Sequence, residues 1–253
     1  MRTAIVIPAR FASSRLPGKP LLRQTGKYLI QHVYERACQA RCVDRVVVAT
    51  DDPRIIAAVE SFGGNVVLTR RDHASGTDRV AEAARSLDAE VIINLQGDEP
   101  CVEPDDVDLL TVLLARDPDA EMATLAVPIK RLEDWRDPSR VKVVCDASGR
   151  ALYFSRSPIP FVRDEQPDFA ARPARFLQHL GLYAYRREFL FRLAAEPPAM
   201  LEEMEKLEQL RVLAMGYEIQ VGIASQASAG VDTLADYEQF VRTYRQGRRL
   251  QAA

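Results

Sequence analysis

Three cationic side chains, Arg10, Arg15 and Lys19, lie within ten residues of one another near the N-terminus. They follow an apolar run over residues 3–7 that predicts a buried strand. Two prolines and a glycine disfavour a regular helix in the loop itself. Because basic loops at the carboxyl edge of an open α/β sheet often hold polyanions, we expect these cations to bind a triphosphate. A solvated basic turn is the alternative.

Two aspartates complement this basic loop. Asp98 follows the apolar run over residues 91–93, within the segment NLQGDEP. A carboxylate beside a polyphosphate is expected to hold Mg²⁺, which takes oxygen ligands, and we favour this role over a turn-capping one. Asp232 directly precedes the last expected helix, so it is either a second metal ligand or the N-cap, and its position slightly favours the cap. Glu99 either orients Asp98 or is a surface acid.

Two further segments carry polar groups that suit a ligand. The run HASGTD over residues 73–78 begins a helix, and its small residues offer backbone N–H groups to an anion or a base. Capping by Ser75 or Thr77 would account for these residue types equally well. Residues 156–176 form a long loop rich in Pro, Arg and Asp, followed by His179 and Tyr183. Such donors suit an acidic, hydroxylated substrate such as a sugar acid, whereas any single Arg there is more simply solvated.

Several common site types are excluded. The sequence holds no Walker A motif, no G-x-G-x-x-G after the first strand and no G-x-S-x-G. Cys38 and Cys42 are one helical turn apart, but no further Cys pair or His lies at zinc-site spacing. We therefore expect reduced core or surface thiols.

The overall composition is that of an ordinary soluble α/β protein. The chain has 253 residues, a formal net charge of −2 and a hydrophobic fraction of 47%. This charge argues against nucleic acid or an anionic membrane as the main partner. No apolar run reaches transmembrane length, and the first strand leaves no room for a secretory signal. We therefore predict a cytoplasmic protein with no membrane partner.

The hydrophobic pattern predicts a doubly wound sheet followed by an antiparallel extension. Strand and helix signals alternate through the first hundred residues, which is typical of parallel α/β sheets. Further along, closely spaced strand candidates indicate antiparallel pairing. The expected strands cover 3–7, 45–49, 65–69, 90–95, 122–127, 141–145, 152–155, 178–185 and 218–224. The expected helices cover 27–40, a short segment from 53, a segment capped by Thr77 or Asp78, 105–115, 202–215 and 234–245.

The chain as a whole resembles the 3-deoxy-manno-octulosonate (Kdo) cytidylyltransferase family. The resemblance rests on IVIPARFASSRLPGKPL, DHASGTDRVAEA, VIINLQGDEP, HLGLYAYR, LEQLRVL and GVDT, which occur in the family's order over nearly the full length. It implies a nucleotide-diphospho-sugar transferase fold, Rossmann-like with a doubly wound mixed sheet. It also implies transfer of CMP from CTP to Kdo with release of pyrophosphate, for lipopolysaccharide biosynthesis.

The resemblance also implies roles for individual residues. The catalytic set is Arg10, Arg15, Lys19 and Asp98. The nucleotide-binding set is Ala9, Arg10, Lys19, Arg71, Ser75, Gly76 and Asp98. The sugar-binding set is Arg79, Gln96, His179, Tyr183, Glu208 and Gln209. The Mg²⁺ ligands are Asp98 and Asp232.

The resemblance further implies a homodimer. We expect a single domain over residues 1–253, with a dimerisation and sugar-binding extension at about residues 120–185. Residues 162–176 match the family poorly, so another acidic sugar, such as 8-amino-Kdo or sialic acid, stays open as the acceptor. Another cytidylyl or guanylyl transfer, such as to an isoprenoid precursor, and a non-catalytic nucleotide sensor are further alternatives.

Overall fold

The computed structural model describes residues 1–12, 16–73, 75–164, 166–170 and 175–251, with side chains described up to residue 247. The chain forms two compact units. Residues 2–108 and 228–253 form one, here called the N-terminal unit, and Met1 with residues 109–227 forms the other, here called the central unit. The expectation of one domain with an extension at about 120–185 stays a prediction.

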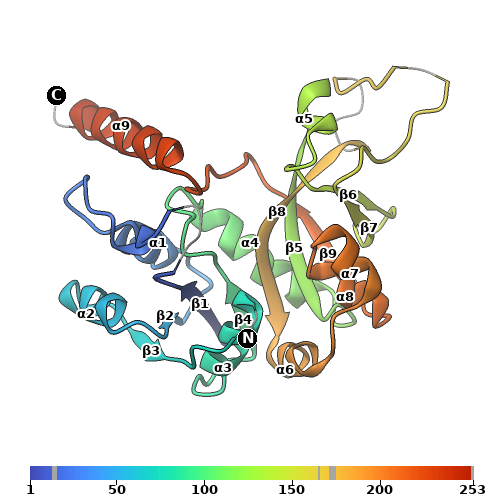
Figure 1. Ribbon diagram of the computed structural model, residues 1–253. Helices are drawn as coiled ribbons and strands as arrows, with labels where there is room; N and C mark the ends of the chain where they lie inside the picture. Colours follow the sequence, from blue (N-terminus) through green and yellow to red (C-terminus); the bar gives the residue numbers. More distant parts are fainter. Residues whose placement is uncertain (13–15, 74, 165, 171–174, 252–253) are drawn as a thin grey trace. The chain divides into compact units, whose positions relative to one another are not determined.

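The N-terminal unit is built on four parallel strands. Their order across the sheet is β3 (Val66–Leu68), β2 (Arg45–Thr50), β1 (Thr3–Ala9) and β4 (Val91–Asn94), which lie side by side in Figure 1. Val6 pairs with Val47 on one side and with Asn94 on the other. Nearly every residue of β1 and β4 is buried, as expected for parallel strands covered on both faces. The doubly wound arrangement predicted from the sequence is confirmed.

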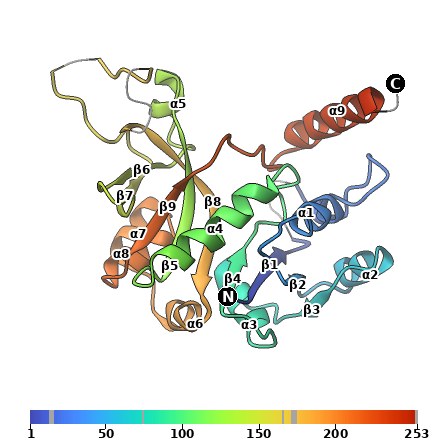
Figure 2. The ribbon, with the colours of Figure 1, turned by 180° about the vertical axis from the view of Figure 1, so that it is seen from behind.

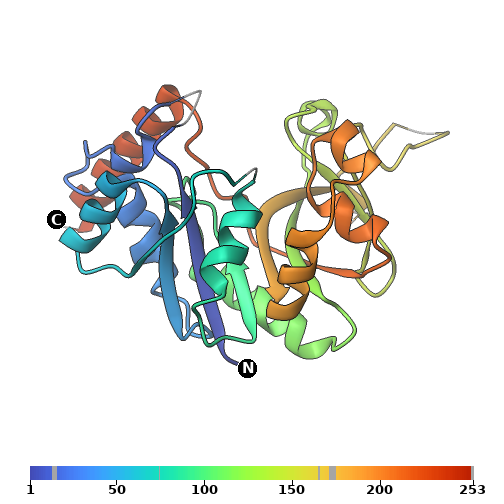
Figure 3. The same cartoon turned by 60° about the horizontal axis from the view of Figure 1, so that its bottom comes forward.

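Helices cover both faces of this sheet. They are the 3₁₀ helix η1 (Lys19–Leu21), α1 (Leu29–Ala37), α2 (Pro53–Ser61), α3 (Gly76–Ala84) and α9 (Leu234–Gln251). Right-handed crossovers place α1 and α2 on one face and α3 on the other, and Figure 3 shows α3 across β1 from α1 and α2. Leu29 of α1 packs with Val231, Tyr237 and Val241, so α9 joins the face that carries α1.

Helix caps differ in part from the sequence prediction. Asp52 caps α2, with Oδ1 accepting a hydrogen bond from Arg54 N at 2.9 Å. Ser75, rather than Thr77 or Asp78, is the N-cap of α3: Ser75 Oγ accepts from Asp78 N at 3.1 Å, and Asp78 Oδ2 accepts from Ser75 N at 3.0 Å. Such a reciprocal capping box satisfies two backbone donors at once.

The cap of α9 is Thr233, so the slight preference for Asp232 as the cap was wrong. Thr233 Oγ1 accepts from Asp236 N at 3.2 Å, and Asp236 Oδ2 accepts from Thr233 N at 2.8 Å. Because the neighbouring hydroxyl performs the capping, the carboxylate of Asp232 can take another partner.

The central unit contains a mixed sheet. β5 (Met122–Pro128) lies between β8 (Leu177–Arg186), which is antiparallel to it, and β9 (Ile219–Ile223), which is parallel. β6 (Lys142–Cys145) and β7 (Ala151–Ser155) form an antiparallel hairpin that pairs with β8. Figure 2 shows β5 between its two neighbours, with the hairpin beside them. These strands confirm the mixed sheet with antiparallel strands that was predicted.

Several helices surround this second sheet. α4 (Pro104–Arg116) contains the boundary between the two units. α5 (Leu132–Arg136) and α6 (Arg187–Ala195) were not predicted, although Phe189, Leu190 and Leu193 of α6 are buried at helical spacing. None of the helices in the described part of the chain is long and apolar enough to cross a membrane.

The helix predicted over residues 202–215 is two helices. α7 (Met200–Glu205) ends where Lys206 adopts a left-handed backbone conformation with φ of 55°, and α8 (Gln209–Ala214) begins three residues later. A left-handed residue ends a helix because it turns the chain away from the helical path. Arg211 of α8 pairs with Glu202 of α7 at 2.5 Å, and this ion pair ties the two short helices together.

Candidate active site

A cavity of about 310 Å³ lies where β1 and β4 end, within the N-terminal unit. The next two strands in the chain, β2 and β3, lie on one side of β1 within the sheet, whereas β4 pairs with the other edge of β1. Ligands of open α/β sheets bind at this kind of switch point, outside the carboxyl ends of the strands. The cavity is lined by Pro8, Ala9, Arg10, Ala12, Lys19, Pro20, Gln96, Gly97, Asp98 and Asp232.

The turn after β4 reaches the cavity because Gly97 lacks a side chain. A Cβ atom built at Gly97 would lie 2.9 Å from the backbone oxygen of Pro8 and 3.3 Å from Ile30 Cδ1. Any larger residue would push the turn away from the end of β1. The close approach places the next residue, Asp98, beside Lys19.

Lys19 lies at the centre of the acidic groups. Its Nζ donates to Asp98 Oδ2 at 2.7 Å and to the backbone oxygen of Val231 at 2.7 Å, and lies 3.5 Å from Asp232 Oδ1. The Lys19 side chain is 12% exposed, whereas those of Asp98 and Asp232 are 30% and 49% exposed. Three residues that are distant in the sequence therefore meet in one cluster, and the carboxylates remain accessible from the cavity.

The donor set suits a hard divalent cation that is shared with a ligand. Two carboxylates, Asp98 and Asp232, converge on one cationic nitrogen. In the described ranges, no three His, Cys, Asp or Glu side chains are grouped so that they alone could hold a metal ion. Mg²⁺ is typically bound by one or two carboxylates, with the remaining ligands supplied by water and substrate phosphates. The arrangement fits that type of site and does not fit a closed structural metal site.

Glu99 is not a plain surface acid. Its Oε2 accepts a hydrogen bond from Ser228 Oγ. Burial raises the pKa of Glu99 to about 7, although the Ser228 hydrogen bond acts in the opposite direction. The sequence alone left the role of Glu99 undecided, and nothing in it singled out Ser228.

Arg10 connects the end of β1 to the start of α3. Its guanidinium donates to the backbone oxygens of His73 at 3.0 Å and of Ser75 at 2.7 Å. These bonds hold the first turn of α3, including Ser75 and Gly76, next to a residue that lines the cavity. Cations that also satisfy backbone carbonyls lose side-chain freedom, so Arg10 is held in place.

The other predicted residues of this unit occupy different environments. Ala9 is the last residue of β1, and Gln96 lines the cavity, where its amide donates to Asn94 Oδ1 at 3.2 Å. Arg71 is exposed on a bend before α3, and Arg15 lies outside the described residues.

Arg79 is a buried residue of α3. Its side chain is 1% exposed and pairs with Asp51 at 2.8 Å, while its Nη1 donates to Thr69 Oγ1 at 2.5 Å. These contacts tie α3 to the residues that follow β2 and β3. A direct contact of Arg79 with a sugar stays a prediction.

The central unit brings together three of the residues predicted to bind sugar. Tyr183 OH donates to Gln209 Oε1 at 3.3 Å, and the rings of His179 and Tyr183 lie 5.4 Å apart. The Nε2 of Gln209 is buried without a hydrogen-bond partner in the described part of the chain. Glu208, next to Gln209, is exposed, and its charge joins burial in raising the pKa of Tyr183.

His179 is held as a neutral ring. Its Nε2 lies 3.0 Å from Thr124 Oγ1, and Phe154 packs edge-on against it at 5.0 Å between ring centroids. Burial lowers the pKa of His179 to about 3. A neutral imidazole has one donor and one acceptor nitrogen, so His179 can orient a polar group but does not supply a positive charge near pH 7.

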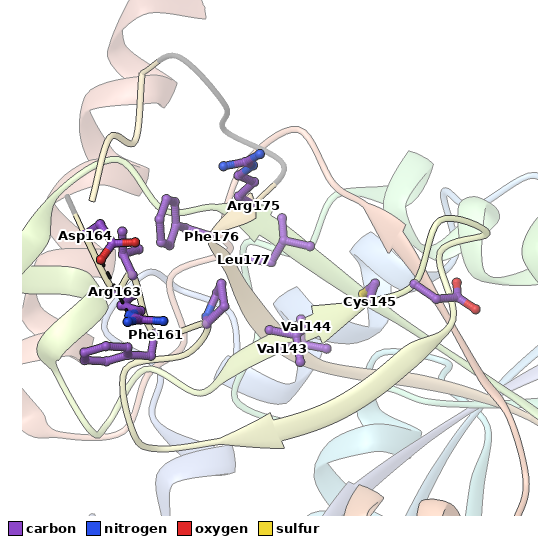
Figure 4. A pocket seen from close by; sticks show the side chains of 12 residues that line it. Val143, Val144, Cys145, Phe161, Arg163, Asp164, Arg175, Phe176 and Leu177 are labelled. Carbon is purple, nitrogen blue, oxygen red and sulfur yellow. Dashed lines mark ion pairs between the residues drawn. The ribbon is translucent and has the colours of Figure 1, made fainter. Parts of the chain in front are cut away.

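The central unit also has a larger cavity, of about 630 Å³. Figure 4 shows Val143, Val144 and Cys145 of β6 on one side of it and Phe161 and Arg163 on the other. Burial raises the pKa of the Cys145 thiol to about 11, which is the opposite of what a reactive thiolate requires. All four cysteines are unpaired, and Cys38 and Cys42 are both exposed.

Comparison with known proteins defines the class to which this fold and site belong. Residues 4–219 match the family model for cytidylyltransferases. The 3-deoxy-manno-octulosonate cytidylyltransferase of Syntrophobacter fumaroxidans is 53% identical over 95% of this chain and 96% of its own length. That of Geobacter sulfurreducens is 51% identical over 94% of this chain and 98% of its own length. The chain therefore belongs to the family of 3-deoxy-manno-octulosonate cytidylyltransferases.

Solved structures agree with this assignment. The structure of a CMP:2-keto-3-deoxy-manno-octonic acid synthetase complexed with CTP is 47% identical, with a TM-score of 0.91 over 98% of this chain and all of that one. A cytidylyltransferase from Leptospira borgpetersenii is only 18% identical but has a TM-score of 0.63 over 95% of this chain, which shows that the fold is shared.

Proposed function

We propose that this protein transfers CMP from CTP to Kdo and releases pyrophosphate. The observation that carries the proposal is the meeting of Lys19, Asp98 and Asp232 at the carboxyl ends of β1 and β4. The chain that surrounds this cluster is 47% identical to a synthetase whose structure was determined with CTP. A basic loop, a switch-point cavity and two accessible carboxylates are the parts that a nucleotidyl transfer requires.

The residues of the chain would act mainly by positioning and by charge. The anomeric hydroxyl of Kdo loses its proton to solvent and attacks the α-phosphorus of CTP, the bond to the β-phosphate breaks, and the electron pair leaves with pyrophosphate. Lys19 would stabilise the negative charge that develops on the departing pyrophosphate. The amides at the start of α3, which Arg10 holds in place, would contact the nucleotide.

Asp98 and Asp232 would hold a Mg²⁺ ion with the phosphates of CTP. Such an ion supplies neutralisation of phosphate charge and lowers the pKa of the attacking hydroxyl. The accessible carboxylates support this, because both already converge on a cation. Thr233 caps α9 in place of Asp232, so helix capping does not compete with the ion for the Asp232 carboxylate.

In the central unit, we propose that Tyr183, Gln209 and His179 contact the sugar. The buried Nε2 of Gln209 is a donor without a partner in the described residues, and such a group is costly unless something accepts from it. A carboxylate or hydroxyl oxygen of an acidic sugar would satisfy this donor. We also propose that Glu208, next to Gln209 in the same unit, contacts the sugar. Contacts of Gln96 and Arg79 with sugar stay predictions.

A panel assay distinguishes the acceptors. Pyrophosphate release from CTP is measured with Kdo, 8-amino-Kdo, sialic acid and 2-C-methylerythritol 4-phosphate, each with and without Mg²⁺. The proposal expects Mg²⁺-dependent release that is fastest with Kdo. Faster release with another acceptor would replace Kdo, and CTP binding without release on any acceptor would favour the nucleotide sensor.

We also propose that the protein is a homodimer formed through the central unit, as the family resemblance implies. β7 supports this, since Leu152 is 62% exposed on a strand that pairs only with β6 among the described residues. Exposed apolar residues on an edge strand favour coverage by another chain. Phe154, by contrast, is completely buried against His179, so it belongs to the core of its own subunit.

A cytoplasmic location is a further proposal.

A further inference from the structure

The two acidic residues of the site come from separate stretches of chain. Asp98 lies in the turn after β4, and Asp232 lies in the segment that enters the N-terminal unit again at residue 228. Neither residue belongs to a helix or a strand. The hydrogen bonds of regular secondary structure therefore do not set the distance between these carboxylates, and contacts between the turn after β4 and the returning segment must do so.

One of those contacts is made at the first residue of the returning segment. Ser228 Oγ donates to the carboxylate of Glu99, the neighbour of Asp98. Three residues further on, the Val231 amide donates to the backbone oxygen of Asp98 at 2.8 Å. Together, the two bonds hold the segment over residues 228–231 along the turn that carries Asp98 and Glu99.

Gly230 lies between these two bonds, in close contact with Glu99. A Cβ atom built there would lie 2.9 Å from Glu99 Oε1 and 3.8 Å from the backbone oxygen of Asp98. At a separation below about 3.0 Å one of the groups must move. The atom nearest to this Cβ position is the end of the Glu99 side chain, so alanine at position 230 would displace the Glu99 carboxylate from its present place beside Ser228.

The next two residues extend the connection to the site. Val231 is 1% exposed and packs with Leu29 and Tyr237, and its backbone oxygen accepts from Lys19 Nζ at 2.7 Å. Asp232 follows directly. Movement of residues 228–231 would therefore shift Asp232 relative to both Lys19 and Asp98.

We propose that Glu99 is a positioning residue that sets the separation of Asp98 and Asp232 by anchoring Ser228 and the adjoining Gly230. The inference rests on the proposed function, because it assigns the purpose of the spacing to a divalent cation bound with CTP. In this proposal, Glu99 contacts neither the divalent cation nor CTP. Outer contacts that orient metal ligands typically contribute about 10–100-fold in metal affinity.

The first readout needs no ligand. Hydrogen exchange of the Val231 amide reports how often its bond to Asp98 opens. We expect Glu99→Ala, Ser228→Ala and Gly230→Ala to accelerate this exchange by about tenfold or more. Glu99→Gln keeps a side-chain oxygen for Ser228, so it should exchange like the wild type. Glu103→Ala, which removes an ion pair with Arg36 from the same region, and Ser61→Ala are the matched controls.

The second readout is Mn²⁺ binding in the presence of CTP without sugar, followed by the paramagnetic signal of free Mn²⁺. The three disruptive variants should bind Mn²⁺ about 10–100-fold more weakly, while Glu99→Gln and both controls stay within about twofold of the wild type. Thermal unfolding confirms that each variant is folded. Ser228→Ala is the mildest change, and it keeps the test valid if Glu99→Ala does not fold.

The outcomes separate this inference from the proposed function. Wild-type Mn²⁺ affinity in both Glu99→Ala and Ser228→Ala would overturn the inference, as would weaker binding with unchanged Val231 exchange. A wild type that binds no Mn²⁺ with CTP would overturn the inference together with the proposed metal site. Weaker binding in the variants with faster Val231 exchange supports the inference, even if the wild type then fails to transfer CMP to Kdo.

Discussion

The ammonium of Lys19 lies 2.7 Å from the carboxylate of Asp98, which joins the basic loop after β1 to the turn after β4. The second aspartate, Asp232, lies 3.5 Å from the same nitrogen. One cation therefore separates two carboxylates that would otherwise repel each other. The charge balance of the site therefore depends on the Lys19 side chain.

Replacing Lys19 with Met is expected to impair the use of CTP specifically. The change removes a cation from the proposed triphosphate site, and a hydrogen bond to a charged group contributes about 1.5–3 kcal/mol. We expect kcat/KM for CTP to fall about tenfold or more, with KM for Kdo little changed, in steady-state kinetics. Lys27→Met is the control, since Lys27 pairs with Glu35 at the surface of the same unit. A defect confined to the sugar parameters would refute this assignment.

Replacing Gly97 with Ala is expected to damage both stability and turnover. The new Cβ would lie 2.9 Å from Pro8 O, and overpacking of this kind costs about 1–3 kcal/mol. Because the turn moves with Asp98, kcat should fall as well. Gly247→Ala is the matched control, since nothing lies within 4 Å of its Cβ position and α9 should be slightly stabilised there. Denaturant unfolding and kcat are measured on both variants, and only Gly97→Ala should lose stability and turnover. Equal behaviour of the two would contradict the close-approach argument.

His179 should make the protein less stable at mildly acidic pH. Its folded pKa of about 3 lies below the reference value of 6.5, so the unfolded state binds the proton more readily between these values. Its contribution to stability is complete above pH 6.5 and falls by about 1.4 kcal/mol per pH unit below that.

Urea unfolding of the wild type and of His179→Gln at pH 7.5 and 5.0 measures this effect. The stability advantage of the wild type over the variant should shrink by about 2 kcal/mol at the lower pH. If the two proteins differ in free energy of unfolding by the same amount at both pH values, His179 is protonated in the folded protein at pH 5.0.

Two substitutions on β7 separate the proposed dimer interface from the core. Leu152→Asp places a charge on the exposed face and should yield a folded monomer in sedimentation experiments. Phe154→Asp places an unpaired charge at a completely buried position and should unfold the central unit. A dimer that persists in Leu152→Asp would move the interface away from this residue, and a monomeric wild type would refute the dimer.

The sequence predicts the N-terminal unit well because its pattern is local. Continuous apolar strands such as β4, each followed by a turn and an amphipathic helix, are typical of parallel α/β sheets and of few other architectures. The same pattern places Asp98 at the carboxyl edge of the sheet. Asp232 was harder to interpret, because Asp232 and Thr233 are both good caps and only the bonds to Asp236 show which of them is used.

Other features depend on contacts that local patterns do not encode. Residues 202–215 have strong helix propensity throughout, yet the left-handed Lys206 and the Glu202–Arg211 pair divide them into two helices. The burial of Arg79 depends on Asp51, which lies on a different element. The role of Glu99 depends on Ser228, which follows the whole central unit in the sequence. Tertiary partners far along the chain decide each of these cases.

The central claim is that the cluster of Lys19, Asp98 and Asp232 transfers CMP to Kdo. It is tested most directly by ³¹P NMR of the protein with CTP, Kdo and Mg²⁺, compared with Asp98→Asn at equal concentration. We predict that the wild type forms CMP-Kdo and pyrophosphate in equal amounts and consumes no CTP without the sugar. The folded Asp98→Asn variant should be slower by about 100-fold or more, since loss of a metal ligand removes several kcal/mol of transition-state stabilisation. Product formation by Asp98→Asn at the wild-type rate, or CTP consumption without CMP-Kdo, would contradict the account.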